Sequence, residues 1–416
     1  MPGIHIKQSL ALEDKLTLMS EDARYDVADN EALGGAERTG LIRERVKSPK
    51  APHTAPKVFM SNDCAFNCAY CSCRRCRDGK VRYTNTPREF AQIALNAAHA
   101  NGGRVFITSA VYRRPDYTEE LIIETMRIMR REMGYRGYLH AKIMPGCDQE
   151  LIRRAGLLAD RLSVNIEVAN SEAYKAIARD KNKSNILGPM GHISSLIREA
   201  KGERGRYKPR FAQSHTTQLM AGSSGEDDST ILNLSNALYG KYRLSRVYYT
   251  PFQFRGRAEG YADRPESRTP VWRQTRLYQA DRLMALYGFS PGDITPADAP
   301  NLSSDYDPKS AWALRNLRLF PVEVNTADLD MLLRVPGIGV TGARRIVIAR
   351  RQCRITHDVL TQLGVSLKRS RHFITAGGRY TGAGSDAPEV YSALLRAPLT
   401  NEINLFNANF YEPSCE

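Results

Sequence analysis

Hydrophobic and polar positions along the chain follow two periods, one typical of strands and one typical of helices. Between residues 56 and 256, short apolar runs such as RVFITS at 104–109 and LSVNIEV at 162–168 alternate with longer amphipathic segments. This alternation is typical of βαβ units, whose strands form a parallel sheet. About six such units fit into the segment, so the pattern predicts an α/β fold with a partial (β/α)6 barrel of the TIM type.

The same pattern sets limits for the elements of this barrel. We expect helices at 87–100, 117–133, 148–159, 187–200 and 228–240, and strands at 57–63, 104–109, 137–144, 162–168, 211–222 and 246–252. In barrels of parallel strands the functional residues lie at the carboxyl ends of the strands. Candidate site residues are therefore expected where each apolar run ends.

Outside the barrel at 56–256, the pattern divides the chain into four further parts. Residues 1–55 combine an amphipathic helix with a polar linker, and residues 257–307 form a connecting segment with one helix around 270–287. Residues 308–381 have the pattern of an all-helical domain, and residues 382–416 form a polar, Asn-rich tail. The sequence therefore predicts two folded domains.

The excess of basic over acidic residues favours a polyanionic binding partner. The 416 residues carry a formal net charge of +15, and a basic protein of this size often binds a polyanion, most commonly nucleic acid. A basic surface that serves only solubility is the alternative. The chain has no run of 18 apolar residues and no signal-peptide pattern, so we expect no membrane contact and a cytoplasmic location.

Five of the eight cysteines lie close together, at Cys64, Cys68, Cys71, Cys73 and Cys76. A dense cluster in a cytosolic chain favours metal binding over a disulfide framework. The first three have the spacing C-x3-C-x2-C, with which three thiolates can hold three irons of a cubane cluster and leave the fourth iron open. Because Cys68/Cys71 and Cys73/Cys76 are both C-x2-C pairs, a zinc site is the alternative.

The three-cysteine motif, placed after the first strand of a βα series, resembles that of the radical S-adenosylmethionine (SAM) superfamily. Within it, the segments ITSAVYRRPDYT, RGYLHAKIMPG, DRLSVNIEV and TTQLMAGSSGEDD resemble, in this order, segments of the DNA modification/repair radical SAM proteins. The resemblance covers roughly residues 10–380, including a C-terminal helix–hairpin–helix domain. It implies a [4Fe–4S] cluster and SAM as cofactors, and reductive cleavage of SAM to a 5′-deoxyadenosyl radical. It also implies a DNA substrate, a reductant such as flavodoxin or ferredoxin, and a uracil-DNA-glycosylase-like partner.

The resemblance assigns roles within the cysteine segment. Cys64, Cys68 and Cys71 are the implied cluster ligands, and Tyr70 is the implied aromatic neighbour of the adenine. Cys73 and Cys76 depart from the family, in which polar residues usually follow the third cysteine. A second metal, hydrogen-atom donation and free thiols remain open for these two residues.

Further roles are implied at the later strand ends. Thr108 and Ser109 fall where the superfamily's glycine-rich segment meets the methionyl amino group, although the Gly-Gly-Glu form is absent here. The residues implied for the carboxylate, ribose and adenine of SAM are Lys142, Asn165, Glu167, Gln218, Gly222 and Glu226. None of these residues is identified as catalytic.

Residues 326–351 predict a helix–hairpin–helix. Thr326 is the expected N-cap of the first helix, Pro336 to Gly339 break the chain, and a second helix begins near Thr341. Hairpin amides and a helix N-terminus favour an anion such as a nucleic-acid phosphate, without base reading. The expected nucleic-acid-binding residues are Gly337, Ile338, Gly339, Thr341, Arg344 and Arg345, with the Ile338 side chain packing the helices together. An ordinary αα-hairpin is the alternative.

Three functions remain open from the sequence. The first is a radical SAM enzyme that modifies or repairs DNA. The second is a radical SAM enzyme that acts on RNA, a peptide or a small molecule. The third is a non-catalytic DNA-binding protein that contains a metal.

Overall fold

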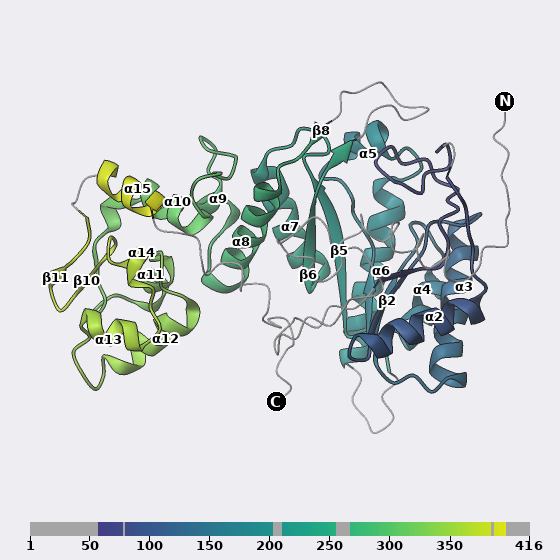
Figure 1. Cartoon of the computed structure of the whole chain (residues 1–416), viewed down its shortest axis with the longest axis horizontal. Helices are drawn as coiled ribbons and strands as arrows, with labels where there is room; N and C mark the ends of the chain where they lie inside the picture. Colours follow the sequence, from purple (N-terminus) through teal and green to yellow (C-terminus); the bar gives the residue numbers. More distant parts are fainter. Residues whose placement is uncertain (1–56, 78–79, 203–209, 255–266, 384–386, 397–416) are drawn as a thin grey trace. The chain divides into compact units, whose positions relative to one another are not determined.

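The computed structural model describes residues 57–77, 80–202, 210–254, 267–383 and 387–396 (Figure 1). Their backbone divides into two compact units. The described residues of the first unit lie within Met1–Glu226 and Ala237–Thr269, and those of the second lie within Asp227–Asn236 and Pro270–Leu405. The amphipathic helix and linker expected in residues 1–55 lie outside the described residues.

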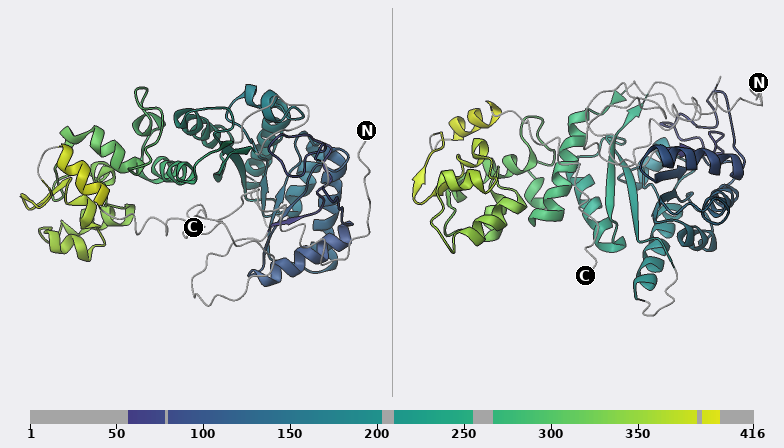
Figure 2. Two further views of the ribbon diagram at one scale, coloured as in Figure 1. Left: turned by 45° about the horizontal axis from the view of Figure 1, so that its top comes forward. Right: turned by 60° about the horizontal axis from the view of Figure 1, so that its bottom comes forward.

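Six parallel strands form the sheet of the first unit, in the order β1-β2-β3-β4-β5-β6. They are β1 (Lys57–Phe59), β2 (Arg104–Thr108), β3 (Tyr138–Lys142), β4 (Arg161–Ser163), β5 (Ser214–Ala221) and β6 (Arg246–Pro251). Every strand pairs with the next one along the chain, so all six carboxyl ends lie at one edge of the sheet. The α/β class and the partial barrel are therefore confirmed (Figures 1 and 2).

The helices of this unit follow the expected order. They are α2 (Pro87–Ala100), α3 (Pro115–Arg127) with the π-helical turn η1 (Ile128–Glu132), α4 (Gln149–Leu158), α5 (Ser171–Ile177), α6 (Lys183–Gly202) and α7 (Asp228–Tyr242). The start of α2 is encoded locally, because Thr86 and Glu89 form a capping box and Pro87 occupies the first turn. The short helix α5 was not predicted.

The core of the first unit lies between the sheet and these helices. Fully buried strand residues include Val58, Val105, Ile107, Leu139 and Leu162. Burying a side chain of this size stabilises the fold by roughly 1.5–3 kcal/mol. The apolar runs that predicted strands are thus the residues that hold the sheet against the helices, and this packing fixes the positions of the strand ends.

The second unit is not all-helical, contrary to the prediction. Its helices are α8 (Val271–Tyr287), α9 (Pro291–Ile294), α10 (Pro308–Arg315), η2 (Leu317–Leu319), α11 (Leu329–Arg334), α12 (Val340–Ala349), α13 (His357–Gln362), α14 (Leu367–Ser370) and α15 (Ala387–Arg396). A three-stranded sheet joins β9 (Val322–Glu323), β10 (Ile374–Ala376) and β11 (Arg379–Tyr380). The strands β9 and β10 pair residues far apart in sequence, β10 and β11 pair close neighbours, and each strand is too short for its periodicity to be recognised.

The segments on either side of residues 308–381 also differ in part from the prediction. The expected helix around 270–287 is α8, which is confirmed. The segment expected to be a polar tail contains α15, which buries Val390 and Leu394. The two-stranded sheet of β7 (Gln253–Phe254) and β8 (Ser267–Arg268) was not predicted. In the described part of the chain, no helix has the length and apolar character needed to cross a bilayer.

Candidate functional site

The cysteine loop, residues 61–84, connects β1 to α2 at the carboxyl edge of the sheet. A β-bridge between Ser61 and Thr84 joins its two ends. The Arg82 guanidinium donates to four carbonyl oxygens of the loop, those of Asn62 at 2.6 Å, Cys73 at 2.9 Å, Arg74 at 2.6 Å and Arg75 at 3.4 Å. Arg82 therefore holds the cysteines in a closed loop at the end of β1.

Backbone contacts fix this loop against its neighbours. The amide of Ala65 donates to the carbonyl oxygen of Val111 at 2.7 Å, after β2, and the amide of Ala69 donates to that of Ile177 at 2.8 Å, at the end of α5. The amide of Asn67 donates to the Asp180 carboxylate at 2.6 Å. The helix α5, which the sequence did not reveal, thus supports the loop that carries the cysteines.

The three motif cysteines, Cys64, Cys68 and Cys71, share the closed loop, and the charge of one raises the pKa of another. Burial raises the pKa of Cys64 to about 11 and that of Cys68 to about 12. Hydrogen bonds from Cys73 lower the pKa of Cys71 to about 6, and one is donated by the Cys73 amide to Cys71 Sγ at 3.3 Å. Buried thiols disfavour a bare negative charge, so a cationic metal centre is the partner that suits their thiolates.

The cysteine loop offers three thiols of the motif, Cys64, Cys68 and Cys71. Among the described residues, no three His, Cys, Asp or Glu side chains converge so that they could hold one metal ion. A cubane cluster makes a different demand, because each thiolate binds its own iron and the sulfurs need not converge. The three motif cysteines, on one closed loop, can meet that demand.

Lys181 is a site residue that the sequence analysis missed. Its Nζ donates to Glu167 Oε1 at 2.9 Å and to the Tyr70 hydroxyl at 3.3 Å, and its side chain is only 11% exposed. Burial alone would lower the pKa of Lys181, but Glu167 and Cys68 raise it, so the amine is charged. A buried ammonium beside the cysteines suits an anionic ligand group. The residue lies between α5 and α6, where no periodicity or motif marks it.

Glu167 and Tyr70 both accept hydrogen bonds from Lys181. Glu167 is 4% exposed and has a φ of 65°, a conformation that non-glycine residues rarely adopt. Its amide donates to the carbonyl oxygen of Gln218 at 2.9 Å, and its carbonyl oxygen accepts from the amide of Met220 at 2.8 Å. The structure therefore gives the Glu167 carboxylate a defined role, which is to pair with Lys181 beside Tyr70.

Three of the predicted strand-end residues have buried polar atoms without a hydrogen-bond partner among the described residues. These atoms are Thr108 Oγ1, Ser109 Oγ and Gln218 Oε1. Buried polar atoms are nearly always satisfied in native proteins, so such atoms indicate a ligand or ordered water. The two other predicted residues, Lys142 and Asn165, lie at the ends of β3 and β4, half-buried and 8% exposed respectively.

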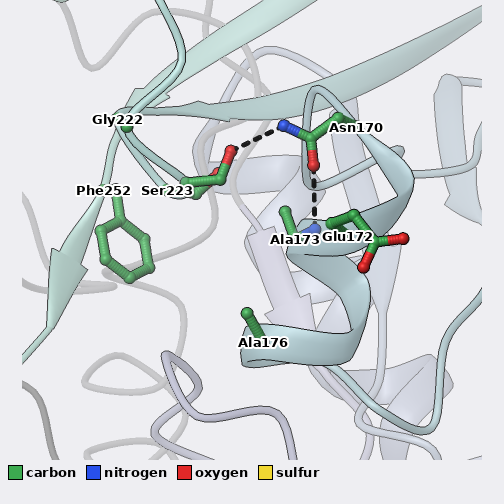
Figure 3. Close-up of a pocket in the computed structure, with 9 residues that line it drawn as sticks. Asn170, Glu172, Ala173, Ala176, Gly222, Ser223 and Phe252 are labelled. Atoms are coloured by element: carbon green, nitrogen blue, oxygen red, sulfur yellow. Dashed lines mark hydrogen bonds between the residues drawn. The ribbon is translucent and has the colours of Figure 1, made fainter.

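A cavity of about 450 Å³ opens beside the end of β5 (Figure 3). Gly222, Ser223 and Asn170 line it, together with Ala173 and Ala176 of α5 and the ring of Phe252. Glu226 fixes the loop that follows β5, because its carboxylate accepts from the amides of Ser223 at 3.2 Å and Ser224 at 2.8 Å. Gly222 thus lines a cavity, and the Glu226 carboxylate holds the loop that follows it.

In the second unit, α11 and α12 are joined by the Pro336–Gly339 turn and form a helical hairpin at the place of the predicted motif. The N-cap of α11 is Asp328, which accepts from the amide of Met331, so the prediction of Thr326 was wrong. Asp328 is the residue whose side chain reaches the third helical amide, which is the geometry of an N-cap. Gly337 has a φ of 85°, and α12 begins at Val340, with Gly339 as its N-cap.

Ile338 offers no open group at the tip of this hairpin. Its side chain is 1% exposed, so its predicted packing role is confirmed. Its amide donates to the carbonyl oxygen of Val335 at 3.1 Å, and its own carbonyl oxygen accepts from Lys309 Nζ at 2.6 Å. The Ile338 side chain and both of its backbone polar groups are therefore engaged within the second unit.

A second hairpin of the same form follows, which the sequence analysis missed. It joins α13 to α14 through Gly364, whose φ is 83°, and the next residue, Val365, is 5% exposed. The two hairpins touch, because the Ser366 amide donates to the carbonyl oxygen of Gly337 at 3.1 Å. Both hairpins have the same sequence feature, a glycine followed by a buried β-branched residue just after a helix, and this feature could have revealed the second hairpin.

Basic side chains surround the two hairpins. Residues 322–380 contain ten Lys and Arg against four Asp and Glu. The exposed ones on α12, α14 and the residues that follow these helices are Arg344, Arg345, Arg351, Lys368 and Arg371. Arg345 also donates to the carbonyl oxygen of Leu363 at 3.3 Å, which ties the first hairpin to the second. Thr341 is exposed in the first turn of α12.

Comparison with known proteins bears on the first unit. The sequence model of the radical SAM superfamily matches residues 58–191, which run from β1 into α6 and include the cysteine loop. A [4Fe–4S] cluster and SAM are the cofactors of this superfamily and of this domain. No curated protein matches the chain.

Some solved structures share part of the fold. The FeFe-hydrogenase maturase HydG from Carboxydothermus hydrogenoformans is 17% identical, with a TM-score of 0.42 over 55% of this chain and 51% of that chain. The radical SAM methyltransferase TsrM from Kitasatospora setae is 14% identical, with a TM-score of 0.35 over 48% of this chain and 37% of that chain. This chain thus spans about half or less of the length of these proteins.

Proposed function

We propose that this chain, whose residues 58–191 form a radical SAM domain, is an enzyme that modifies or repairs DNA by radical chemistry. Members of the superfamily are enzymes, and the cysteine loop and cavity of this chain suit its cofactors. The observation that carries the choice of nucleic acid is the pair of touching hairpins in a strongly basic part of the second unit.

Within the first unit, each group has a task that follows from its surroundings. Cys64, Cys68 and Cys71 would bind three irons of the cluster, and Lys181, which pairs with Glu167, would offer a further N–H to the carboxylate of SAM. The unpartnered oxygens of Thr108 and Gln218 would hydrogen-bond its polar groups. With one electron from a reductant, the two cofactors would supply methionine and a 5′-deoxyadenosyl radical able to abstract hydrogen from an unactivated carbon. The buried strand ends keep water away from that chemistry.

In the second unit, the hairpins bind the nucleic-acid backbone. The first amides of α12 have no partner within their own helix and the helix dipole favours an anion there, so a phosphate suits the position after Gly339. Arg344 and Arg345 add charge in the same helix. Such contacts position a duplex without reading its bases. DNA is favoured over RNA by the segments that resemble DNA modification/repair proteins.

Two partners are part of this proposal. A one-electron reductant is needed to start the reaction, and a flavodoxin or ferredoxin suits that task. The resemblance also favours a uracil-DNA-glycosylase-like protein, which would supply or consume a damaged base.

The chemistry is tested with the full chain, reconstituted anaerobically with iron and sulfide. Dithionite and SAM are expected to give 5′-deoxyadenosine, and nucleoside mass spectrometry of defined duplexes is expected to reveal a changed nucleoside. A loaded cluster that yields no 5′-deoxyadenosine would contradict the radical chemistry. A changed nucleoside in RNA and none in DNA would overturn the choice of substrate.

The hairpin surface is tested by fluorescence anisotropy with a labelled duplex at rising salt. The double substitution Arg344→Ala/Arg345→Ala is expected to weaken binding and to lower the slope of log K against log salt by about 2. Arg318→Ala, an exposed arginine of η2, is the matched control and is expected to bind like the wild type. Equal binding by all three proteins would remove the hairpins from the interface.

A further inference from the structure

The turn that follows β2 holds an exposed arginine in an unusual backbone conformation. Arg113 has a φ of 61°, in the left-handed region that favours glycine. Its side chain is exposed, and its neighbours Tyr112 and Tyr117 are half-buried. Non-glycine residues in this region persist only where surrounding structure fixes them, and they cluster at functional sites.

Buried groups beneath the turn fix it, and the arginine side chain does not. Thr118, which is fully buried, donates through its hydroxyl to the carbonyl oxygens of Tyr112 at 2.8 Å and Arg114 at 3.0 Å. The Arg114 amide also donates to the carbonyl oxygen of Tyr112 at 2.8 Å. The turn therefore presents Arg113 whether or not its side chain makes any contact.

The guanidinium of Arg113 contacts two neighbouring aromatic rings. It is 5.2 Å from the ring centre of Tyr112 and 5.0 Å from that of Tyr117, and the two rings are 6.0 Å apart. Among the described residues no carboxylate pairs with it. Asp116, next to Tyr117 in sequence, accepts instead from the amide of Asp148 at 2.8 Å. The rings thus hold a charged, exposed and planar group in place, with its charge available to a ligand.

The turn lies beside the cysteine loop. Val111, two residues before Arg113, accepts a hydrogen bond from Ala65, which directly follows Cys64. The turn also sits at the carboxyl end of β2, the edge at which barrels of this type place their functional residues. A substrate that reaches the cofactors from this side meets Tyr112, Arg113 and Tyr117.

We propose that Tyr112, Arg113 and Tyr117 form a platform that binds one unpaired nucleotide of the nucleic-acid substrate. The base stacks on the guanidinium and the tyrosine rings, and the adjoining phosphate meets the charge of Arg113. Bases offer their faces for stacking only when they are out of the duplex, and aromatic rings with arginine recognise them without regard to sequence. The proposal rests on the proposed function and adds to it the place and the unpaired state of the reacting nucleotide.

The test uses the full chain and a single-stranded 12-mer that contains one 2-aminopurine, whose fluorescence falls when the base stacks. Arg113→Gly is expected to weaken binding about tenfold and to abolish the quenching. Tyr112→Ala/Tyr117→Ala is expected to act likewise, whereas Tyr112→Phe/Tyr117→Phe retains the rings and the wild-type signal. The control, Arg136→Ala, removes an exposed arginine before β3, at the opposite end of the sheet, and is expected to change nothing.

Thermal unfolding separates a lost contact from a lost fold. Glycine accepts a φ of 61° without strain, so Arg113→Gly is expected to unfold at the wild-type temperature or above it. If Arg113→Gly binds and quenches like the wild type while the hairpin variant Arg344→Ala/Arg345→Ala loses binding, the platform is refuted and the proposed function stands. If the wild-type chain binds no oligonucleotide at low salt, the proposed function itself fails.

Discussion

The sulfur atoms of the cysteine loop differ in how strongly their surroundings favour the thiolate. Cys64 and Cys68 are held neutral by burial, whereas Cys71 receives hydrogen bonds from Cys73. Hydrogen bonds to a ligating sulfur tune the reduction potential of a cluster. The backbone amide of Cys73 makes one of these bonds, so part of this effect does not depend on the Cys73 side chain.

Replacing any one of the motif cysteines, Cys64, Cys68 or Cys71, with alanine is expected to abolish cluster binding, because an iron loses its only protein ligand. Cys73→Ala and Cys76→Ala are the matched controls and are expected to retain it. Iron and sulfide content and the absorbance spectrum after anaerobic reconstitution measure the outcome. Loss of iron from Cys73→Ala would show instead that a fourth cysteine is a ligand.

Glu119 of α3 is a buried carboxyl group outside the cofactor site. It is fully buried, one oxygen accepts from the Met144 amide at 2.9 Å, and the other has no partner among the described residues. Burial raises the pKa of Glu119 from 4.5 to about 8, against the opposing effect of the Met144 amide. The folded chain therefore keeps this proton between pH 4.5 and 8, while the unfolded chain releases it.

Because the folded state binds the extra proton, the wild-type free energy of unfolding is expected to fall as pH rises from 4.5 to 8. Glu119→Gln cannot ionise, so its advantage over the wild type is expected to grow across this window, to the order of a few kcal/mol. Urea unfolding followed by circular dichroism at pH 5 and pH 8 measures it. A constant difference between the two proteins would contradict the argument.

Candidate residues could be selected from the sequence where a strand end marked the position. Thr108, Ser109 and Gln218 could be chosen because each lies at or near the carboxyl end of an apolar run, and their oxygens prove to be buried without partners. Lys181 could not be chosen, because a loop lysine beside Glu167 and Tyr70 follows from tertiary packing alone.

At the scale of elements, the hairpins depend on a close approach at one glycine. A Cβ at Gly337 would lie 2.6 Å from the carbonyl oxygen of Ser366 and 2.9 Å from the amide nitrogen of Ser370, both backbone atoms. Gly378, with a φ of 79°, has no atom within 4 Å of such a Cβ. An alanine at either glycine would be strained by the positive φ, but only an alanine at Gly337 would also collide with neighbouring backbone atoms.

Gly337→Ala is expected to destabilise the second unit by about 3 kcal/mol or more, because both costs apply. Gly378→Ala carries only the conformational cost, about 1–2 kcal/mol. Both tryptophans of the chain, Trp272 and Trp312, belong to the second unit, so their fluorescence during urea unfolding reports on it. Equal effects of the two substitutions would mean that the hairpins do not touch at Gly337.

In the small sheet of β9, β10 and β11, the carboxylate of Glu323 binds backbone amides of the turn after β9 and of the turn between β10 and β11. Glu323 accepts from the amides of Asn325 at 3.1 Å, Gly377 at 3.0 Å and Gly378 at 2.8 Å. Burial raises its pKa, but these hydrogen bonds and that of the Asn325 side chain outweigh the effect and lower it from 4.5 to about 2. Its stabilising effect is complete above pH 4.5 and is lost as pH falls through 2.

Glu323→Gln is expected to cost about 1 kcal/mol of unfolding free energy at pH 7, a value reduced for the solvent that screens this half-exposed group. The difference from the wild type is expected to shrink as the pH falls from 4.5 towards 2. Tryptophan fluorescence during urea unfolding at pH 7 and pH 3 checks both statements. A difference that persists unchanged at pH 3 would assign the effect to packing.

Elements could be predicted where their own residues decide them. The barrel helices carry an apolar stripe and local caps, so α2 was predicted with its limits. The strand β4 is shorter than its apolar run, because beyond Ser163 the side-chain hydroxyl of Thr217 accepts from the Ile166 amide and donates to the Val164 carbonyl oxygen. The sheet of β9 to β11 joins residues fifty apart, whose pairing depends on the packed unit rather than on local sequence.

At the scale of the whole molecule, the two units are expected to respond to different ligands. SAM is expected to slow amide hydrogen exchange around β1, β5 and the cysteine loop, and a DNA duplex is expected to slow it in α12 and α14. Hydrogen-exchange mass spectrometry of the reconstituted chain with each ligand alone gives the comparison. Protection of α12 by SAM alone would contradict separate binding sites.

The helix α7 belongs to both units. Its residues up to Asn236 group with the second unit and the rest with the first. Asp228, 1% exposed, pairs with Arg273 at 2.7 Å and accepts from the Leu302 amide at 2.8 Å. A gene exchange that replaced only the segment from Pro270 onward would remove Arg273 and leave the Asp228 carboxylate buried and unpaired, at a cost of about 3–5 kcal/mol. The two segments that make up the second unit are therefore expected to be inherited together.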